Sequence, residues 1–152
     1  MDRCDRYDRL SIAVFPGSFD PFTEGHQVIV YRALRLFDKV IVAVGVNSDK
    51  EYMFTAEERM AMINQRFEEN DRVEVVCYSD MTVELCHRVN AQFIVRGIRD
   101  SKDLTYEQTV AAVNHTLDPN IETVILLADL EHQNISSTLE REKIKHCTSQ
   151  TT

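Results

Sequence analysis

Short apolar runs alternate with longer amphipathic segments along most of the chain. The apolar runs are continuous, which is typical of strands that are buried on both faces of a parallel sheet. We expect five strands, at Ser11–Phe15, Lys39–Val46, Val73–Tyr78, Gln92–Val95 and Glu122–Ala128. Because strands and helices alternate, the pattern predicts an α/β fold, a doubly wound five-stranded parallel sheet with right-handed crossovers and helices on both faces.

The segments between the strands have the apolar spacing of amphipathic helices. The second helix opens with the capping box Thr55-Ala-Glu-Glu58, and a last helix opens with Ser137-Thr-Leu-Glu140. The third and fourth are expected near Thr82–Asn90 and Lys102–Leu117. The expected inward residues of the first four helices are, in chain order, Ile29, Ala33, Leu36 and Phe37; Met60, Ile63 and Phe67; Leu85 and Val89; and Val110, Val113 and Leu117.

The composition is that of one folded globular domain. The chain has 152 residues, of which 43% are hydrophobic and 28% are charged. Its formal net charge of −8 argues against a nucleic-acid surface, so a local cluster of Lys, Arg and helix N-termini must hold any anionic substrate. No apolar run approaches the roughly 20 residues that span a bilayer. We expect a flexible extension over residues 1–10, without a secretory signal, and a polar tail over residues 147–152.

The four cysteines, Cys4, Cys77, Cys86 and Cys147, include no Cys-x-x-Cys pair and no metal-ligand spacing. Cys77 and Cys86 lie in apolar patterns, where buried free thiols are typical. This cysteine usage predicts a reducing, cytoplasmic location.

Polar residues that could carry chemistry follow the expected strands. In doubly wound sheets, ligands bind outside the carboxyl ends of the strands, where the strand order reverses. We expect five loops to converge there, at Gly17–His26, Lys50, Ser79–Thr82, Arg96–Arg99 and Ser136–Thr138.

The loop that ends at His26 is the strongest of these signals. Gly17 and Gly25 would let a polyanion approach the backbone, and the free N–H groups of the following helix favour negative charge. His26 could hydrogen-bond a phosphate and, if protonated, neutralise its charge. A histidine at this position could instead cap or pack the helix start, but its combination with Ser18 and Gly25 favours a phosphate site.

Arginines after the fourth strand have two interpretations. Arg96 and Arg99 offer forked donors that suit phosphate oxygens. They could instead pair with Asp100, Asp103 or Glu107 at the surface.

The other polar positions are also ambiguous. Ser136, Ser137 and Thr138 suit a triphosphate, although one of them could simply cap a helix. Lys50 is either a phosphate ligand or a solvated charge. Asn114 shares a helix face with Glu107, where the two either bind a ligand or solvate that face.

Some familiar motifs are missing from the sequence. It contains no Gly-x-x-x-x-Gly-Lys-[Ser/Thr] phosphate loop, no Gly-x-Gly-x-x-Gly fingerprint and no Gly-x-Ser-x-Gly elbow. These absences count against P-loop kinases, NAD enzymes and hydrolases.

Two motifs resemble those of a known superfamily. Gly17-Ser-Phe-Asp-Pro-Phe-Thr-Glu-Gly-His26 resembles the (His/Thr)-x-Gly-His motif of nucleotidyltransferases, and Ile135-Ser-Ser-Thr138 resembles their second motif. Thr23 stands where many relatives have the first histidine. Together with Val95-Arg-Gly-Ile-Arg99, Tyr106-Glu107 and Asn114, the pattern is similar to bacterial phosphopantetheine adenylyltransferases, from about Ser11 to Glu142.

The resemblance implies a Rossmann-like fold, with a single nucleotidyltransferase domain over residues 11–146. It implies that ATP and 4′-phosphopantetheine give dephospho-coenzyme A and pyrophosphate, with Mg²⁺ assisting, in coenzyme A biosynthesis. The acceptor phosphate would attack the α-phosphorus of ATP in line, so catalysis would depend on positioning and charge neutralisation. It also implies a cytoplasmic homohexamer that binds neither nucleic acid nor a membrane.

The resemblance also implies residue roles. His26 would stabilise the charge that develops on the transferred phosphate. The residues implied to bind ATP are Ser18, Phe19, His26, Gly97, Ile98, Arg99, Glu107, His132, Gln133, Asn134, Ile135, Ser136, Ser137 and Thr138. Those implied to bind the acceptor are Ser18, Lys50, Thr82 and Arg96. No protein ligand to a metal is implied, and His132 stands where many members carry an aromatic residue.

Two other functions are compatible with the sequence. One is another transferase of the superfamily, such as a glycerol-phosphate cytidylyltransferase or a nicotinamide mononucleotide adenylyltransferase, against which Thr23 and Arg96–Arg99 argue. The other is a non-catalytic nucleotide-binding protein.

Overall fold

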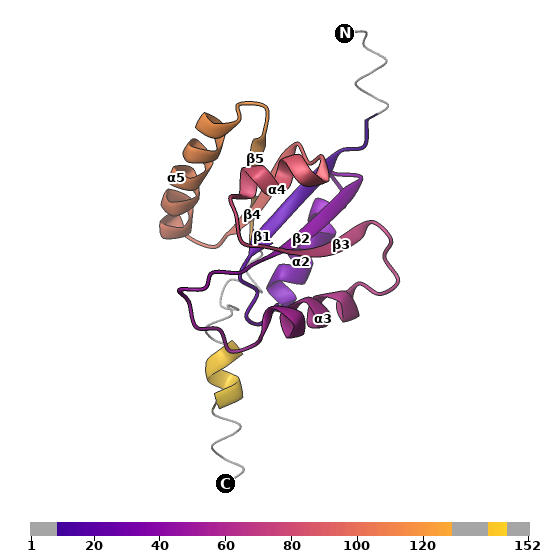
Figure 1. Cartoon of the computed structure of the whole chain (residues 1–152), viewed down its shortest axis with the longest axis vertical. Helices are drawn as coiled ribbons and strands as arrows, with labels where there is room; N and C mark the ends of the chain where they lie inside the picture. The colour runs from indigo at the N-terminus through magenta and orange to yellow at the C-terminus, as the bar shows by residue number, and fades with distance from the viewer. Residues whose placement is uncertain (1–8, 129–139, 146–152) are drawn as a thin grey trace.

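A five-stranded sheet forms the centre of the computed structural model, which describes residues 9–128 and 140–145. All strands are parallel, and their order is β3-β2-β1-β4-β5. The strands are β1 (Ile12–Gly17), β2 (Lys39–Gly45), β3 (Val73–Tyr78), β4 (Phe93–Ile98) and β5 (Glu122–Leu127). The helices between them are α2 (Glu24–Ala33), α3 (Ala56–Arg66), α4 (Thr82–Val89) and α5 (Ser101–Leu117) (Figure 1). The predicted doubly wound α/β fold is confirmed.

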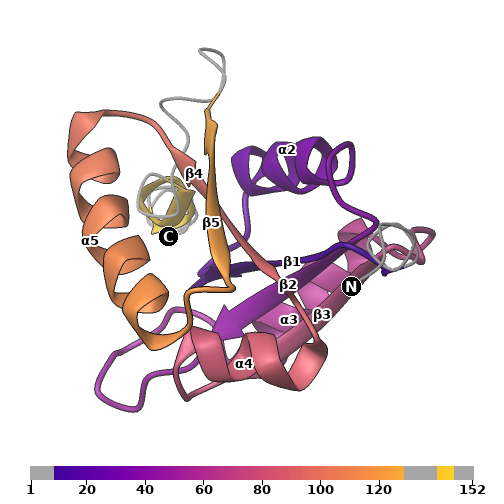
Figure 2. The same ribbon diagram turned by 90° about the horizontal axis from the view of Figure 1, so that it is seen from above.

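Helices cover both faces of the sheet, and Figure 2 shows α2 and α4 on opposite sides of it. Successive strand residues point to opposite faces, so each strand contributes to two apolar clusters. Phe15 and Val42 belong to the cluster under α2 and α3, whereas Val14 and Ile41 belong to the cluster under α4. Helix α5 contacts α4, β4 and β5. The core is therefore divided by the sheet into two layers.

The three central strands are buried as predicted, but the two outer strands are only partly covered. β3 and β5 each have a neighbouring strand on one side only. Cys77, near the end of edge strand β3, is exposed, so the prediction of a buried thiol there is wrong. Cys86 in α4 is buried as predicted, and burial raises the pKa of its thiol to about 11.

The helix predictions fail at the end of α2. This helix ends at Ala33, so Leu36 lies in the following turn and is exposed, whereas Phe37 is buried. Residues 140–145 are helical, and the predicted start of that helix at Ser137 lies outside the described residues.

The inward face of α5 also differs from the prediction. Val113 and Leu117 are 54% and 48% exposed, and the buried residues of α5 are Glu107 and Asn114. This inversion of the usual pattern indicates that α5 faces a polar site and not only the core. In the described part of the chain, no helix, α5 included, has the length and apolar content that are needed to cross a membrane.

Arg72 holds the amino ends of β2 and β3 to the end of α2. Its Nε donates to the Asp38 carbonyl at 2.9 Å, and its Nη2 donates to the carbonyls of Leu34 and Phe37 at 2.6 and 2.8 Å. Carbonyls at a helix end lack partners within the helix, so an arginine is well suited to satisfy them. These contacts stabilise the end of the sheet at which the strands begin.

Candidate active site

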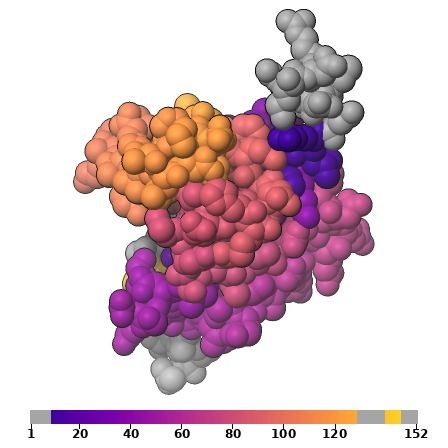
Figure 3. Space-filling model, turned by 45° about the horizontal axis from the view of Figure 1, so that its top comes forward, coloured from indigo at the N-terminus to yellow at the C-terminus, as the bar shows by residue number. Residues whose placement is uncertain are grey.

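A cavity of about 240 Å³ lies at the carboxyl ends of β1 and β4. The strand order reverses between these two strands, which is where doubly wound sheets bind ligands. Helices α4 (rose) and α5 (orange) meet on the surface in Figure 3, and the loop after β2 (purple) projects below them. The residues that line the cavity are Pro16, Gly17, Ser18, Tyr78, Thr82, Ile94, Arg96, Tyr106, Glu107, Val110, Ala111, Asn114 and Thr123.

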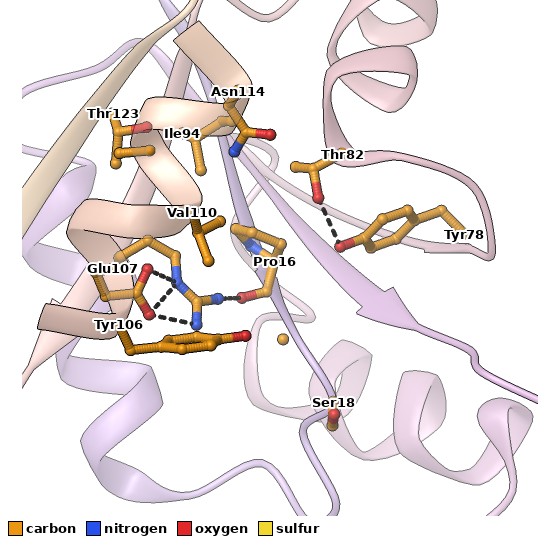
Figure 4. Close-up of a pocket in the computed structure, with 13 residues that line it drawn as sticks. Pro16, Ser18, Tyr78, Thr82, Ile94, Tyr106, Glu107, Val110, Asn114 and Thr123 are labelled. Atoms are coloured by element: carbon orange, nitrogen blue, oxygen red, sulfur yellow. Dashed lines mark hydrogen bonds and ion pairs between the residues drawn. The ribbon is translucent and has the colours of Figure 1, made fainter. Parts of the chain in front are cut away.

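An ion pair between Arg96 and Glu107 forms one wall of the cavity (Figure 4). The Nε atom of Arg96 donates to both carboxylate oxygens at 2.9 Å, and Nη2 donates to Oε1 at 2.8 Å. Its Nη1 donates to the Pro16 carbonyl, and Glu107 is only 5% exposed. These contacts use three of the five guanidinium N–H groups, so two can still donate to a ligand while Glu107 fixes their direction.

The residues that follow Arg96 serve partly structural purposes. A Cβ atom on Gly97 would lie 3.2 Å from the Ile29 side chain, so this glycine permits α2 to pack closely on β4. Ile98 is buried in the core. Arg99 is exposed, and its Nε donates to Asp103 at 3.3 Å. The ion-pair alternative for both arginines therefore exists in this structure, and for Arg96 it exists inside the cavity.

The turn after β1 is shaped by Phe19, whose φ of +50° lies in the left-handed region. A Cβ on Gly17 would lie 2.8 Å from Cζ of Phe19, so the room beside this glycine is filled by the phenylalanine ring. It is not left open for a polyanion. Ser18, between the two, is exposed and lines the cavity. A Cβ on Gly25 would make only an ordinary contact, at 3.5 Å from Oγ1 of Thr23.

His26 completes a capping box at the start of α2. Thr23 Oγ1 accepts from the His26 backbone N–H at 3.4 Å, and the Thr23 backbone N–H donates to Nδ1 of His26 at 2.9 Å. Since Nδ1 accepts a hydrogen bond, the proton of the neutral ring lies on Nε2. The imidazole packs against the rings of Phe15, Phe19 and Phe22, with centroid distances of 6.3, 5.0 and 5.2 Å.

The surroundings of His26 keep its ring uncharged. Burial, and after it the positive charges of Arg96, Arg66 and Arg99, lower its pKa from 6.5 to about 4. Near neutral pH the ring therefore offers an Nε2–H donor and no positive charge.

Hydroxyl and amide groups form the other walls of the cavity. The Tyr78 hydroxyl and Thr82 Oγ1 lie 3.1 Å apart, and burial raises the pKa of Tyr78. Figure 4 shows Asn114 on α5 across the cavity from Thr82. The Asn114 amide is 9% exposed and has no hydrogen-bond partner among the described residues. A buried amide without a partner destabilises a protein, so this group is well placed to bind a ligand.

The structure brings some predicted site residues together and leaves others apart. Ser18, Thr82, Arg96 and Glu107 line the cavity, whereas Phe19, His26, Lys50, Gly97, Ile98 and Arg99 do not. Lys50 is exposed between β2 and α3, and its Nζ has no partner among the described residues. The predicted stretch from His132 to Thr138 lies outside the described residues. Sequence reasoning missed Tyr78, because an aromatic residue at the end of an apolar strand is typical of a core.

Comparison with known proteins first defines the class. A family model described as cytidylyltransferase-like matches residues 14–143. A bifunctional NMN adenylyltransferase/ADP ribose pyrophosphatase from Francisella tularensis has the same fold, with a TM-score of 0.68 and 24% identity, over 89% of this chain and 42% of that protein. The family model and the fold thus place this chain among cytidylyltransferase-like proteins.

Curated relatives narrow this class. A phosphopantetheine adenylyltransferase from Leuconostoc citreum is 48% identical over 133 residues, which are 88% of this chain and 84% of the relative. Another from Leptospira biflexa is 43% identical over 136 residues, 90% of this chain and 85% of the relative. The chain belongs to the phosphopantetheine adenylyltransferase family, as its motifs suggested.

The tautomer and pKa of His26 are directly testable. We expect long-range ¹H–¹⁵N NMR spectra to show the Nε2–H form, with no titration between about pH 8 and pH 5, because partial burial and the nearby arginines oppose protonation of the ring. In urea the same residue should titrate near its ordinary value of about 6.5. The unfolded chain then binds the proton first, so His26 should lower stability as the pH falls from about 6.5 to about 4. A folded-state midpoint near 6.5 would contradict the assignment of a neutral ring.

Proposed function

We propose that this protein transfers the adenylyl group of ATP to 4′-phosphopantetheine, giving dephospho-coenzyme A and pyrophosphate. The cavity at the β1–β4 reversal carries the proposal, because it combines a fixed guanidinium with a buried amide that lacks a partner among the described residues. Such a cavity suits an acceptor with a phosphate at one end and an amide-containing arm at the other. Relatives that are named for this activity match nearly the whole chain.

In the proposed reaction, an oxygen of the acceptor phosphate attacks the α-phosphorus of ATP. A new P–O bond forms as the bond from the α-phosphorus to the oxygen that bridges to the β-phosphorus breaks. The electron pair of the broken bond leaves with pyrophosphate. No bond to the protein is formed, so the side chains have to align the two phosphates and stabilise the developing charge.

The acceptor is assigned to one group of residues. Lys50 and Arg96 would hold its phosphate, and Thr82 would contact its arm. Glu107 supports this role of Arg96, since its carboxylate fixes the guanidinium. Ser18 would contact both substrates, because its exposed side chain lines the cavity beside the turn that leads to His26.

The nucleotide is assigned to the neighbouring residues. His26 would donate its Nε2–H to an oxygen of the transferred phosphate, where negative charge develops. The remaining proposed nucleotide contacts are Phe19, Gly97, Ile98, Arg99, Glu107 and residues 132–138. In a chain with a net charge of −8, this local group of arginines is what makes binding of a triphosphate favourable.

Mg²⁺ is proposed as the cofactor. In the described ranges, no three His, Cys, Asp or Glu side chains gather in a way that could hold a metal ion. Mg²⁺ in phosphate-transfer sites is held largely by substrate phosphates and water, so the proposal does not require a cluster of protein ligands. When bound, Mg²⁺ would neutralise charge on the phosphate oxygens. A cytoplasmic location and assembly as a homohexamer are proposed from the family resemblance.

An assay of product formation tests the proposed function. We expect pyrophosphate release to require ATP, 4′-phosphopantetheine and Mg²⁺ together, with dephospho-coenzyme A identified by mass spectrometry. CTP with glycerol phosphate, and ATP with nicotinamide mononucleotide, serve as competing substrate pairs. Turnover with only one of those pairs would reject the proposal. Ligand binding without turnover would favour a non-catalytic nucleotide-binding protein.

The role of His26 can be separated from its capping role. His26→Ala and His26→Gln should both lower kcat by about 100-fold or more, as loss of a transition-state donor does, with ATP affinity nearly unchanged. Glutamine at this position can still accept from the Thr23 N–H, so His26→Gln should keep the capping box that His26→Ala loses. Activity in His26→Gln but not in His26→Ala would show that the residue acts only as a cap.

Lys50 should act on the acceptor and not on the nucleotide. We expect Lys50→Ala to weaken 4′-phosphopantetheine binding by about 10-fold, the loss of one charge-assisted contact, with ATP affinity unchanged. Titration calorimetry with each substrate measures the two affinities. Lys39→Ala is the matched control, because Lys39 is the first residue of β2 and pairs with Glu74 at the end of the sheet where the strands begin. Equal losses for both substrates in Lys50→Ala would reject this assignment.

A further inference from the structure

Arg59 on α3 is 1% exposed, which is unusual for a charged residue. In the described part of the chain its guanidinium forms no ion pair, and all its hydrogen bonds go to backbone carbonyls. Nη1 donates to Ser18 at 2.7 Å and to Gly45 at 3.1 Å, and Nε donates to Phe54 at 3.2 Å and to Thr55 at 3.4 Å. Burying a charge without an opposite charge is costly, so this arrangement calls for an explanation.

The carbonyl contacts place Arg59 between two loops of the site. Gly45 ends β2, and Ser18 follows β1 and lines the cavity. One nitrogen of the guanidinium thus joins the carboxyl ends of two neighbouring strands. The planar fork of arginine allows Nε to donate to the Phe54 and Thr55 carbonyls at the same time.

Tyr52 extends this connection to the loop that carries Lys50. Its ring centroid lies 4.0 Å from Cζ of Arg59, which is a close cation–π contact. Its hydroxyl accepts from the Asn47 N–H at 3.0 Å. Tyr52 and Asn47 lie on either side of Lys50 in the sequence, so these contacts restrain the loop at both sides of the lysine.

Asp20 makes the reciprocal connection. It is buried, and its two carboxylate oxygens accept from the Met53 and Phe54 backbone N–H groups at 2.8 and 2.9 Å. Arg59 therefore reaches from α3 to the Ser18 turn, and Asp20 reaches from that turn to the segment that links Lys50 to α3.

The Ser18 carbonyl is also where the backbone needs support. Phe19, the next residue, has a φ of +50°, and non-glycine residues remain in this region only when their surroundings hold them there. Arg59 holds the peptide group that joins Ser18 to Phe19. The Phe19 ring in turn packs on His26, with centroids 5.0 Å apart.

We propose that Arg59 is a positioning residue that sets the separation between the Ser18 turn and the Lys50 loop. The inference rests on the proposed function, in which the Ser18 turn contacts both substrates and leads to His26 at the transferred phosphate, while Lys50 helps to hold the acceptor phosphate. In-line transfer needs the two at close range, and a misplacement of about 1 Å can cost about 100-fold in rate. Arg59 touches neither substrate and acts through the backbone.

Arg72 provides a matched control for this idea. It also donates to three backbone carbonyls, but it does so at the edge where the strands begin, far along the sheet from Ser18 and Gly45. We expect Arg59→Met to lower kcat by about 30- to 100-fold, the scale of a misplaced reacting group, with a smaller effect on both KM values. Arg72→Met should lower the melting temperature and leave kcat unchanged.

Arg59→Lys tests the geometry of the fork and keeps the charge. A lysine ammonium cannot span the same four carbonyls, so kcat should still fall by about 10-fold. This variant also carries the test if Arg59→Met does not fold. Full activity in Arg59→Lys would overturn the proposal. The proposal would also be overturned if Arg59→Met and Arg72→Met both lost kcat in proportion to their loss of stability.

Hydrogen exchange provides a readout that does not depend on turnover. Arg59→Met should speed exchange in residues 17–20 and 46–54 and leave residues 34–40 unchanged, whereas Arg72→Met should do the reverse. Unchanged exchange at residues 17–20 in Arg59→Met, or in Arg59→Lys if only that variant folds, would overturn the proposal. If the wild-type protein does not form dephospho-coenzyme A, the proposed function fails, and the exchange comparison alone then decides whether Arg59 positions the loops.

Discussion

The parallel direction of all five strands is the constraint on which the site depends. Ala13 is in register with Val40 of β2 and with Phe93 of β4, so the three central strands run level and end at the same edge. Arg96 can therefore donate to the Pro16 carbonyl of the neighbouring strand. Helices α2 and α5 follow β1 and β4, so both begin near this end of the sheet. Residues that are far apart in the sequence then surround one cavity.

His26 shows how local structure sets chemical state. The capping box assigns the proton to Nε2, and the phenylalanine rings that pack on the imidazole disfavour its charged form by reducing its hydration. The nearby arginines act in the same direction, because positive charges oppose a further one. In the proposed reaction, positive charge and hydrogen-bond donation would therefore come from different residues: the arginines would supply the charge, and His26 would supply a neutral N–H donor.

Much of the fold could be predicted because strand burial and helix caps are encoded locally. The capping box at Thr55, for example, is present as expected. The exposure of Cys77 could not be predicted, since it depends on β3 being an edge strand. The usual rule places apolar residues inward, which predicts Val110, Val113 and Leu117 on the inward face of α5; only Val110 lines the cavity. The actual inward residues, Glu107 and Asn114, face a cavity, which a pattern of hydrophobicity does not reveal.

The same limit applies within the site. Ser18, Arg96 and Glu107 could be proposed from motifs, but their contacts could not. Arg59 lies in an ordinary helical sequence, and nothing local indicates that its guanidinium meets carbonyls from two other segments.

The polar inward face of α5 has a consequence for the protein as a whole. Asn114 is a buried amide whose hydrogen bonds are unmade by the described residues, so a ligand that pairs with it completes the packing of α5. Such a ligand acts as a part of the folded core that is supplied from solution. By mass action it stabilises the folded state in proportion to the logarithm of its concentration once the site is nearly saturated. The free energy of unfolding would then depend on the concentration of whichever ligand pairs with Asn114.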